Sequence, residues 1–311
     1  MRFFLGALVV LCLLSVTSLL VGVAELGGDD ALNLLLISRL PRLFAILICG
    51  FSLAICGSIM QMLVRNRFVE PMTVGTGQGA AVGILLVTVF FAAAPLMLKM
   101  LVASVTALVA SLVFLAIVNR LPPTQPYTVA LVGLVYGGIL AAGVTFFAYQ
   151  VDLLQYIDVW INGEFSGVLQ GRYELLWVAA IVCALSYLVA DQFSIVGMGR
   201  TATINLGLSY RQVMIFGLAM ISLVSALTVI TVGMIPFVGL IVPNIVSRFC
   251  GDNLRKTLPI IGCVGAVTVL AADLLGRIVR YPFEVPASTV LGVLGAALFI
   301  WLLYKPAIHA R

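Results

Sequence analysis

Charged residues are scarce in this chain. Asp, Glu, Lys and Arg make up 9% of its 311 residues and hydrophobic residues make up 63%, whereas an ordinary soluble domain is about 25% charged. No polar segment is long enough to fold as a separate soluble domain. A soluble protein with several buried helices would have too little polar surface left to face water. The composition therefore predicts an all-α polytopic membrane protein with a single transmembrane domain over residues 1–311.

Residues that commonly carry bond chemistry are also scarce. The one histidine, His309, lies in the C-terminal tail, so imidazole ligation and a Ser-His-Asp arrangement inside the membrane are excluded. The six cysteines are scattered without a CxxC pair, which favours a packing role over a metal site. The ATP-binding pattern GxxxxGKS/T is absent. We therefore expect a protein that is not an enzyme, holds no cofactor or metal, and takes its energy from another polypeptide or an ion gradient.

Uncharged apolar segments that could each cross about 30 Å of hydrocarbon recur along the chain. The first runs from Phe3 to Ala24 and is 22 residues long, whereas the apolar core of a secretory signal has about 7–15 residues. We interpret it as a retained helix and not as a cleaved signal. About ten transmembrane helices are predicted, at 3–24, 43–64, 72–94, 96–118, 128–149, 173–190, 213–232, 236–249, 258–279 and 286–304.

The distribution of positive charge predicts the orientation of these spans, because Lys and Arg collect in cytoplasmic loops. With ten spans both termini lie on one side of the membrane. Placing the N- and C-termini in the cytoplasm puts eleven of the 17 basic residues inside and six outside. We therefore expect cytoplasmic termini. The six basic residues left outside are Arg39, Arg42, Lys99, Arg172, Arg277 and Arg280.

Two of the predicted outer helix ends carry arginine pairs. In the Arg-Leu-Pro-Arg sequence, Pro41 suits the first turn of a helix and would present Arg39 and Arg42 just above the membrane. The second pair, at the end of the ninth span, is Arg277 and Arg280, and Asp273 lies four residues before Arg277 on the same helix face. Guanidinium groups bind carboxylates through paired hydrogen bonds, so these ends predict a docking surface for an acidic soluble partner. Contact with lipid phosphates is the alternative.

Longer motifs follow one another in order along nearly the whole chain. They are RLPR, GFSLAICGSIMQMLVRNRFVEP, TVGTGQGAAVGI, WINGEFSG, GRTATINLGLSYR, PFVGLIVPNIVSRFCGD, LAADLLGR and FEVPASTVLGVLGAALFIWLL. In this order and spacing they resemble the FecCD-type permeases, which are membrane subunits of bacterial ABC importers for iron–siderophore complexes, haem and cobalamin. The resemblance implies a BtuC-like permease fold in the bacterial cytoplasmic (inner) membrane.

The resemblance also implies partners. These are a cytoplasmic ABC ATPase dimer, a second permease subunit that is homologous or identical, and a periplasmic or lipid-anchored siderophore-binding protein. The chain would lie in the lipid bilayer, and no nucleic acid is expected. In that family the arginines of RLPR and of the ADxxxR helix meet acidic residues of the binding protein. This implies docking through Arg39, Arg42 and Arg277, on elements at about 38–43 and 273–286.

The segment at about 192–211 resembles the part of these permeases that packs into the ATPase. It is polar, punctuated by glycine and too short to span the membrane, although an ordinary loop would look similar. Family members usually carry acidic residues just after the first glycine, where this chain has Arg200 and Thr201. The residues that match the family's coupling region are Gly199, Ala202, Leu206 and Gly207.

Small and weakly polar residues mark the predicted transport pathway. Such a wall suits a pathway that passes a bulky ligand without gripping it, and the residues concerned are Ser52, Ser58, Gln61, Thr228 and Thr231. Glycines in the fifth and tenth predicted spans form small-xxx-small patterns that allow close helix packing. One interpretation is that these glycines serve packing within one subunit. The other is that they lie at the subunit interface and the pathway, and both interpretations can hold together. The candidate pathway and interface residues are Gln61, Gly133, Gly137, Gly138, Gly292 and Gly295.

Departures from the family pattern bear on the substrate. Pro236 stands where a glycine is common, and Asn244 stands where a histidine usually follows Val-Pro. With RNRFVEP, these features resemble the siderophore branch, and within it permeases for catecholate-type siderophores. Import of cobalamin or haem is the alternative within the family.

Two other classes of protein are weighed against an importer subunit. Carriers driven by an ion gradient usually place carboxylates within the membrane, but the predicted spans are nearly free of acidic residues. Asp273 is the deepest, and Arg277 one turn later can neutralise it. A scaffold subunit without transport activity is the third class, and the motif match disfavours it.

Overall fold

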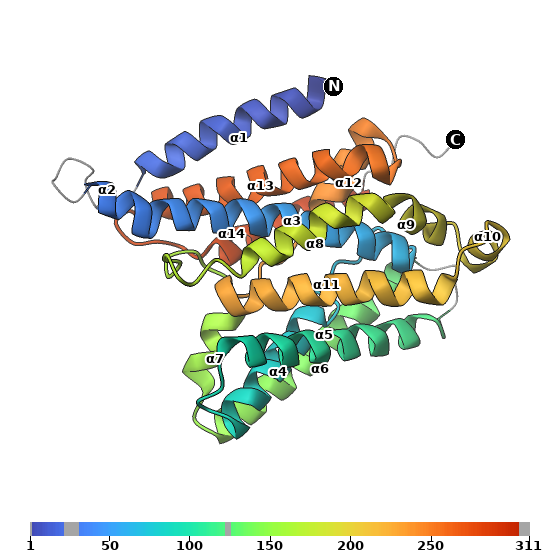
Figure 1. Cartoon of the computed structure of the whole chain (residues 1–311), viewed down its shortest axis with the longest axis horizontal. Coiled ribbons are helices and arrows are strands. Elements are labelled where there is room, and N and C mark those ends of the chain that lie inside the picture. Colours follow the sequence, from blue (N-terminus) through green and yellow to red (C-terminus); the bar gives the residue numbers. More distant parts are fainter. Residues whose placement is uncertain (1, 22–30, 122–125, 305–311) are drawn as a thin grey trace.

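The computed structural model describes residues 2–21, 31–121 and 126–304, and all regular elements in these ranges are helices. Figure 1 shows them packed side by side, with α2 near one end of the bundle and α10 at the other. The end of the first predicted span, near Ala24, and the histidine at 309 lie outside the described residues. The elements are α1 (Arg2–Leu20), α2 (Ala31–Leu34), η1 (Leu35–Arg39), α3 (Leu40–Val64), α4 (Thr76–Phe90), α5 (Leu96–Val118), α6 (Pro126–Gln150), α7 (Leu154–Ile161), α8 (Leu176–Ser186), η2 (Tyr187–Val189), α9 (Ala190–Gly197), α10 (Arg200–Asn205), α11 (Tyr210–Val232), α12 (Val238–Cys250), α13 (Leu254–Val279) and α14 (Ala287–Tyr304).

The all-helical class is confirmed. Seven helical stretches of the described chain are long and apolar enough to cross a membrane. Three more apolar helices, Thr76–Phe90, Val238–Cys250 and Ala287–Leu302, are shorter and fall at the third, eighth and tenth predicted spans. Ten crossings therefore stay a prediction.

The central helix is α3, and 83% of the best apolar window of its stretch is buried inside the protein. It packs against α8, α9, α11, α12 and α13. At Gly57 an added Cβ would lie 2.0 Å from the carbonyl oxygen of Gly239 in α12, and at Gly50 it would lie 2.5 Å from that of Gly265 in α13. Because the obstructing atoms are backbone, the two crossings accept only glycine on α3.

The helical run that leads into α3 begins earlier than predicted. The elements α2 and η1, the latter a π-helix, continue into α3 without a break. Pro41 lies in the first turn of α3, as predicted, and the residues before it extend the helical run as a π-helix. Proline has no N–H to offer the carbonyl four residues earlier, and that carbonyl, of Ile37, accepts a hydrogen bond of 3.0 Å from the backbone N–H of Gln170 instead.

The sixth predicted span is longer than expected, since α8, η2 and α9 form one apolar stretch from Leu176 to Gly197. The segment predicted to couple to an ATPase therefore begins inside α9. The helices α3, α8, α9, α12 and α13 form one group around α3. A second group, α4, α5, α6 and α7, lies below it in Figure 1. Helix α11 joins the two groups, because it contacts α3 and α8 on one side and α4 and α5 on the other.

Candidate functional site

Arg42, Asp273, Arg277 and Glu284 form an ionic group that we call the arginine cluster. Arg42 donates from Nη2 to Asp273 at 2.8 Å, and it holds both carboxylate oxygens of Glu284, at 3.0 and 2.8 Å. Arg277 pairs with the second oxygen of Asp273. The side chain of Asp273 is 3% exposed and that of Arg277 is 7% exposed. The predicted neutralisation of Asp273 by Arg277 is confirmed, and Arg42 adds a second counter-ion from α3.

Arginines also hold the C-terminal end of α1. Arg277 donates from Nη1 to the carbonyl oxygens of Ser18 and Val21, at 3.1 and 3.2 Å. Arg39 donates to the carbonyl oxygen of Leu19 and, at 3.3 Å, to that of Leu20. The last carbonyls of a helix have no partner within it, and they carry partial negative charge. Only 6% of the apolar window of α1 is buried, so packing alone holds this helix weakly. The hydrogen bonds from Arg39 and Arg277 therefore help to hold α1 against η1 and α13.

The structure thus brings the three predicted docking arginines to one end of the bundle but gives them internal partners. Arg42 is 14% exposed in its side chain, and Glu284, at 29%, is the most exposed member of the cluster. Docking of a soluble partner on these residues stays a prediction. Their roles in pairing α3 with α13 and in capping α1 were not foreseen, because contacts between distant segments leave no mark on local sequence.

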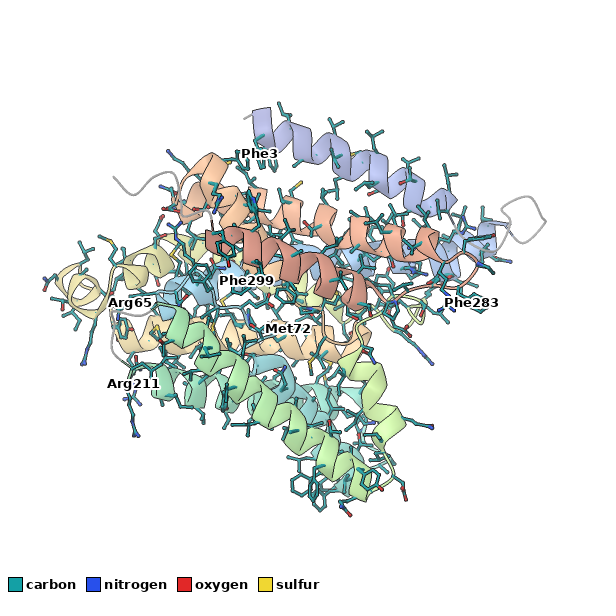
Figure 2. The ribbon with its side chains drawn as sticks, turned by 180° about the vertical axis from the view of Figure 1, so that it is seen from behind. Phe3, Arg65, Met72, Arg211, Phe283 and Phe299 are labelled. Atoms are coloured by element: carbon teal, nitrogen blue, oxygen red, sulfur yellow. The ribbon has the colours of Figure 1, made fainter. Side chains whose placement is uncertain are left out.

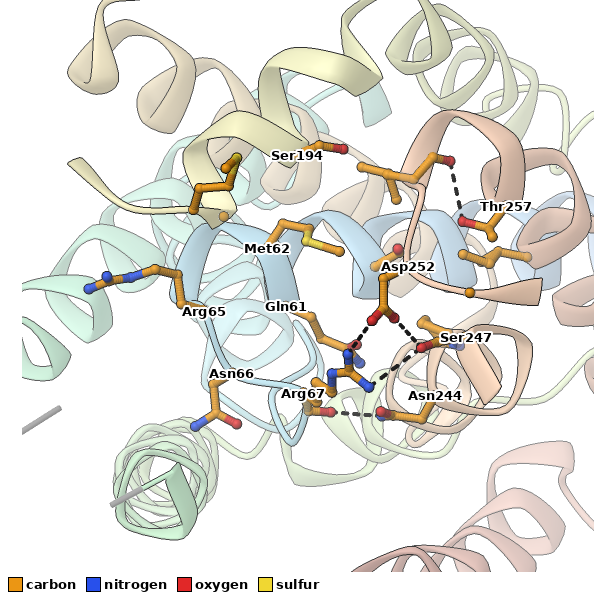
Figure 3. A pocket seen from close by; sticks show the side chains of 17 residues that line it. Gln61, Met62, Arg65, Asn66, Arg67, Ser194, Asn244, Ser247, Asp252 and Thr257 are labelled. Atoms are coloured by element: carbon orange, nitrogen blue, oxygen red, sulfur yellow. Dashed lines mark hydrogen bonds and ion pairs between the residues drawn. The ribbon is translucent and has the colours of Figure 1, made fainter. Parts of the chain in front are cut away.

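A polar pocket of about 350 Å³ lies at the opposite end of α3, between α3, α9, α12 and α13 (Figure 3). Arg67 pairs with Asp252 at 2.7 Å, and Asn244 donates to the carbonyl oxygen of Arg67 at 2.7 Å. Gln61 donates to the carbonyl oxygen of Gly239 at 3.1 Å. Asn244, noted as a departure from the family pattern, thus ties the middle of α12 to the segment after α3.

The wall predicted for the pathway lies mostly inside the subunit. Ser52 and Thr228 have no exposed surface, and Ser58 is 3% exposed. Gln61 is 8% exposed and lines the polar pocket. Ser52 and Thr228 are therefore core residues and do not line an open pathway, which corrects that expectation. A single sequence shows which residues are small and polar, but it does not show which face of a buried helix meets a cavity.

The candidate coupling segment projects from the bundle at α10, beyond the end of α9 (Figure 1). Gly199 and Gly207 have left-handed φ angles of 109° and 78°, which favour glycine. Large apolar side chains around α10 face outward, with exposures of 70% for Met198, 55% for Ile204 and 59% for Leu206. Large apolar side chains are also exposed along the long helices, where lipid would cover them, but these three lie on a segment too short to span a membrane and so form a candidate contact surface. Ala202 is half-buried beneath them.

The candidate glycines of α6 and α14 divide into two sets. An added Cβ at Gly133 or Gly137 would meet Val74 or the carbonyl oxygen of Thr73, at 2.6 and 2.8 Å, so these glycines serve packing within the subunit. Gly138 and Gly292 have no atom within 4 Å of an added Cβ, so they lie on open surface. The predicted internal use of glycine is seen in the first set.

A second cavity, of about 430 Å³, borders these helices. Gly137 and Gly138 of α6 line it, with Ser288 and Thr289 of α14 opposite. We call it the α6–α14 cavity. Helices α4 and α7 also contribute to its walls, as do two non-helical segments, one before α4 and one between α11 and α12, which supply Met72, Thr73, Met234, Pro236 and Phe237. Figure 2 shows Met72 near the centre of the molecule, with Arg65 and Arg211 at one end and Phe283 at the other.

Glu70 is the functional candidate that sequence reasoning missed. Its side chain is 1% exposed and accepts hydrogen bonds from the backbone N–H groups of Phe237, at 2.6 Å, and Leu240, at 3.1 Å. It therefore caps the start of α12 from 167 residues away. The available signal was an acidic residue in an otherwise basic segment, RNRFVEP, but its position between two spans suggested a loop.

These features define a polytopic helical membrane protein whose charged groups gather at the two ends of the bundle. The FecCD transport family matches residues 3–305, and the chain belongs to this family of ABC transporter permease subunits, which are not themselves enzymes.

Two relatives illustrate the likeness. The petrobactin import system permease protein YclN of Bacillus subtilis (strain 168) is 42% identical over 97% of this chain and 98% of its own. The ferric-anguibactin transport system permease protein FatD of Vibrio anguillarum (strain ATCC 68554 / 775) is 40% identical over 87% of this chain and 86% of its own.

A solved structure described as an inward-facing metal-chelate type ABC transporter has the same fold. It superposes with a TM-score of 0.82, at 24% identity, over 98% of this chain and 99% of that one. The likeness establishes the arrangement of the helices.

Proposed function

We propose that this chain is the membrane-spanning permease subunit of an ATP-driven importer for iron–siderophore complexes, with the catecholate type favoured. The observation that carries the proposal is the full-length likeness to a petrobactin import permease, at 42% identity over 97% of this chain. A second relative, 40% identical, carries ferric-anguibactin in its name. Both ligands are siderophores, which favours this branch over cobalamin or haem.

The buried carboxylates support import powered from outside the chain. Among the described residues only two acidic side chains are buried, Glu70 and Asp273. Asp273 is paired with two arginines, and Glu70 accepts hydrogen bonds from backbone N–H groups at the start of α12. A carrier driven by protons needs an acid that can load and release a proton within the membrane. Both buried acids instead have structural partners.

We propose a surface for each of the expected partners. The exposed apolar rim of α10, with Gly199, Ala202, Leu206 and Gly207, would dock on an ATPase dimer. The arginine cluster with Arg39 would receive the binding protein. The open glycines Gly138 and Gly292 would face the second permease subunit and a shared pathway.

We further propose ten membrane crossings within one domain, residues 1–311, in the bacterial cytoplasmic membrane with both termini in the cytoplasm. The orientation is tested by Lys256→Cys and Arg172→Cys, each in a chain without its native cysteines. Both positions are exposed and lie on opposite sides of the predicted membrane. An impermeant thiol reagent added to intact cells should label the second variant and spare the first. The reverse pattern would invert the topology and the docking assignments.

The function is tested by uptake in cells that lack this chain. Restoring it should restore accumulation of iron from a ferric catecholate siderophore, and excess cobalamin or haem should not compete. The tagged chain should co-purify with a P-loop ATPase, and a Walker A lysine variant of that ATPase should abolish uptake. Competition by cobalamin or haem would move the substrate to the alternative. Transport by the chain alone in proteoliposomes, driven by a proton gradient without ATP, would support the secondary-transporter reading.

A further inference from the structure

The start of α12 is held by a side chain from a distant part of the protein. Phe237 stands at the N-cap position with a left-handed φ of 69°, and its own side chain makes no capping hydrogen bond. The first N–H groups of a helix have no partner within it and attract negative charge. Glu70 provides the acceptors, with one carboxylate oxygen on the N–H of Phe237 and the other on that of Leu240.

The surroundings of Glu70 leave it little freedom. It is 1% exposed, and an added Cβ on Gly239 would lie 3.3 Å from its Oε2 atom. A hydrogen bond between a carboxylate and a backbone N–H is stronger than one between neutral groups. The two bonds therefore join the segment between α3 and α4 to the non-helical turn between α11 and α12.

The same two segments form walls of the α6–α14 cavity. Met72 and Thr73 lie two and three residues after Glu70, and Phe237 lies on the opposite segment. The Phe237 side chain packs on Gly295 of α14, where an added Cβ would lie 2.6 Å from the Cβ of Phe237. Glu70 thus fixes the backbone of the aromatic residue that packs on α14 and borders the cavity.

We propose that Phe237 is a gating side chain of the transport pathway, and that Glu70 is the positioning residue that holds it against Gly295. This inference rests on the proposed function, because it takes the α6–α14 cavity as part of the route of the ferric siderophore. A bulky ligand that crosses this cavity must pass the Phe237 side chain where it packs against α14. Passage requires the turn at Phe237 to move, and the bonds to Glu70 resist that movement.

The first test measures the position of the turn without any transport. Phe237→Cys is made in a chain without its native cysteines, and its alkylation by N-ethylmaleimide in membranes is timed with Glu70 and with Glu70→Gln. The amide keeps one oxygen acceptor but brings an N–H group towards a backbone N–H. Loss of a charged hydrogen bond should raise the alkylation rate roughly tenfold or more. Thr76→Val is the control, because the buried hydroxyl of Thr76 bonds Ser111 and does not reach α12.

The second test asks whether Glu70 acts on transport through Phe237. Glu70→Gln is measured for iron uptake and for ATP hydrolysis, in the native chain and in Phe237→Ala. Glu70→Gln should raise basal ATP hydrolysis relative to uptake in the native chain, and this effect should disappear when Phe237 is already alanine. An equal effect in both backgrounds would refute the gating role and leave Glu70 as a support of the fold alone.

The two tests separate this inference from the proposed function. An unchanged alkylation rate in Glu70→Gln refutes the positioning role whatever the chain transports. If alkylation responds but the parent chain imports no siderophore, the proposed function fails and positioning by Glu70 stands. If Glu70→Gln does not accumulate in membranes, hydrogen exchange is followed in Gly295→Ala. That added methyl should push Phe237 away and speed exchange at the N–H of Phe237, and unchanged exchange would refute the contact.

Discussion

Asp273 is the shared partner of two arginines, and its replacement by asparagine tests how far the arginine cluster stabilises the fold. Asp273→Asn keeps the size of the side chain but removes the charge that faces Arg42 at 2.8 Å and Arg277. Arg42 retains Glu284, whereas Arg277, 7% exposed, retains only the carbonyl oxygens of α1. Leaving one buried charge without its partner costs about 3–5 kcal/mol.

We expect Asp273→Asn to lower the free energy of unfolding by about 3 kcal/mol, near the lower end of this range, because both guanidinium groups keep other acceptors. At about 2 °C for each kcal/mol in a large chain, the melting temperature should fall by roughly 6 °C. The measurement is thermal unfolding of the purified protein in detergent. Glu284→Gln is the control, because Glu284 is the most exposed member of the cluster, at 29%, and ion pairs contribute less as they approach the surface, down to about 0.2–1 kcal/mol when exposed.

A double replacement sharpens the test. Asp273→Asn with Arg277→Gln removes both charges of the most buried pair, so it should be less destabilising than the two single losses added together. If Asp273→Asn is no more harmful than Glu284→Gln, the cluster is not a buried ionic group and the reasoning is wrong. The stability of the cluster also affects any test of docking through Arg42. Reversing Arg42 to glutamate would break this cluster as well as any contact with a binding protein, so partner affinity must be measured on folded protein.

Two further predictions concern glycines. Gly207→Trp should leave the protein inserted but uncouple ATP hydrolysis from uptake, because its φ of 78° is strained for any other residue and the ring would disturb docking beside α10. Gly171→Trp is the matched control, because Gly171 has a φ of 90° and equally open surroundings, and it should keep coupling. Normal uptake in Gly207→Trp would show that this segment does not couple ATP hydrolysis to transport. Gly57→Ala should lower stability by about 1–3 kcal/mol through overpacking, because its Cβ would lie 2.0 Å from a backbone oxygen of α12. Gly143→Ala, with nothing within 4 Å, should cost almost nothing in the same unfolding measurement, and equal losses would contradict the close crossing.

The fold class could be read from the sequence because membrane helices obey local rules. Each helix satisfies its own backbone hydrogen bonds, so a long apolar segment without charge is sufficient to predict it. The approximate positions of the helices followed from this rule. Their ends were less predictable, as the early start at Ala31 and the extension of the sixth span to Gly197 show, because contacts with other segments decide where a helix stops.

The candidate site was only partly predictable. The pairing of Asp273 with Arg277 follows from their spacing on one helix, and the pattern of motifs identified the family. The bonds from Arg42 to Asp273 and from Glu70 to Phe237 cross 231 and 167 residues of sequence. No local pattern records such contacts in a single sequence.

The sequence by itself determined that this chain is an all-helical membrane protein, because composition and apolar length decide what the bilayer accepts. It also determined the family, through motifs that run along the chain. Only the tertiary structure decided which charges are internal. The packing of α3 against α13 and α12 buries Asp273 and Glu70, and a buried carboxylate must find positive or N–H partners within the protein. That requirement makes Arg42 and Arg277 counter-ions of Asp273, and it makes Glu70, which looked like a loop residue, the cap of α12.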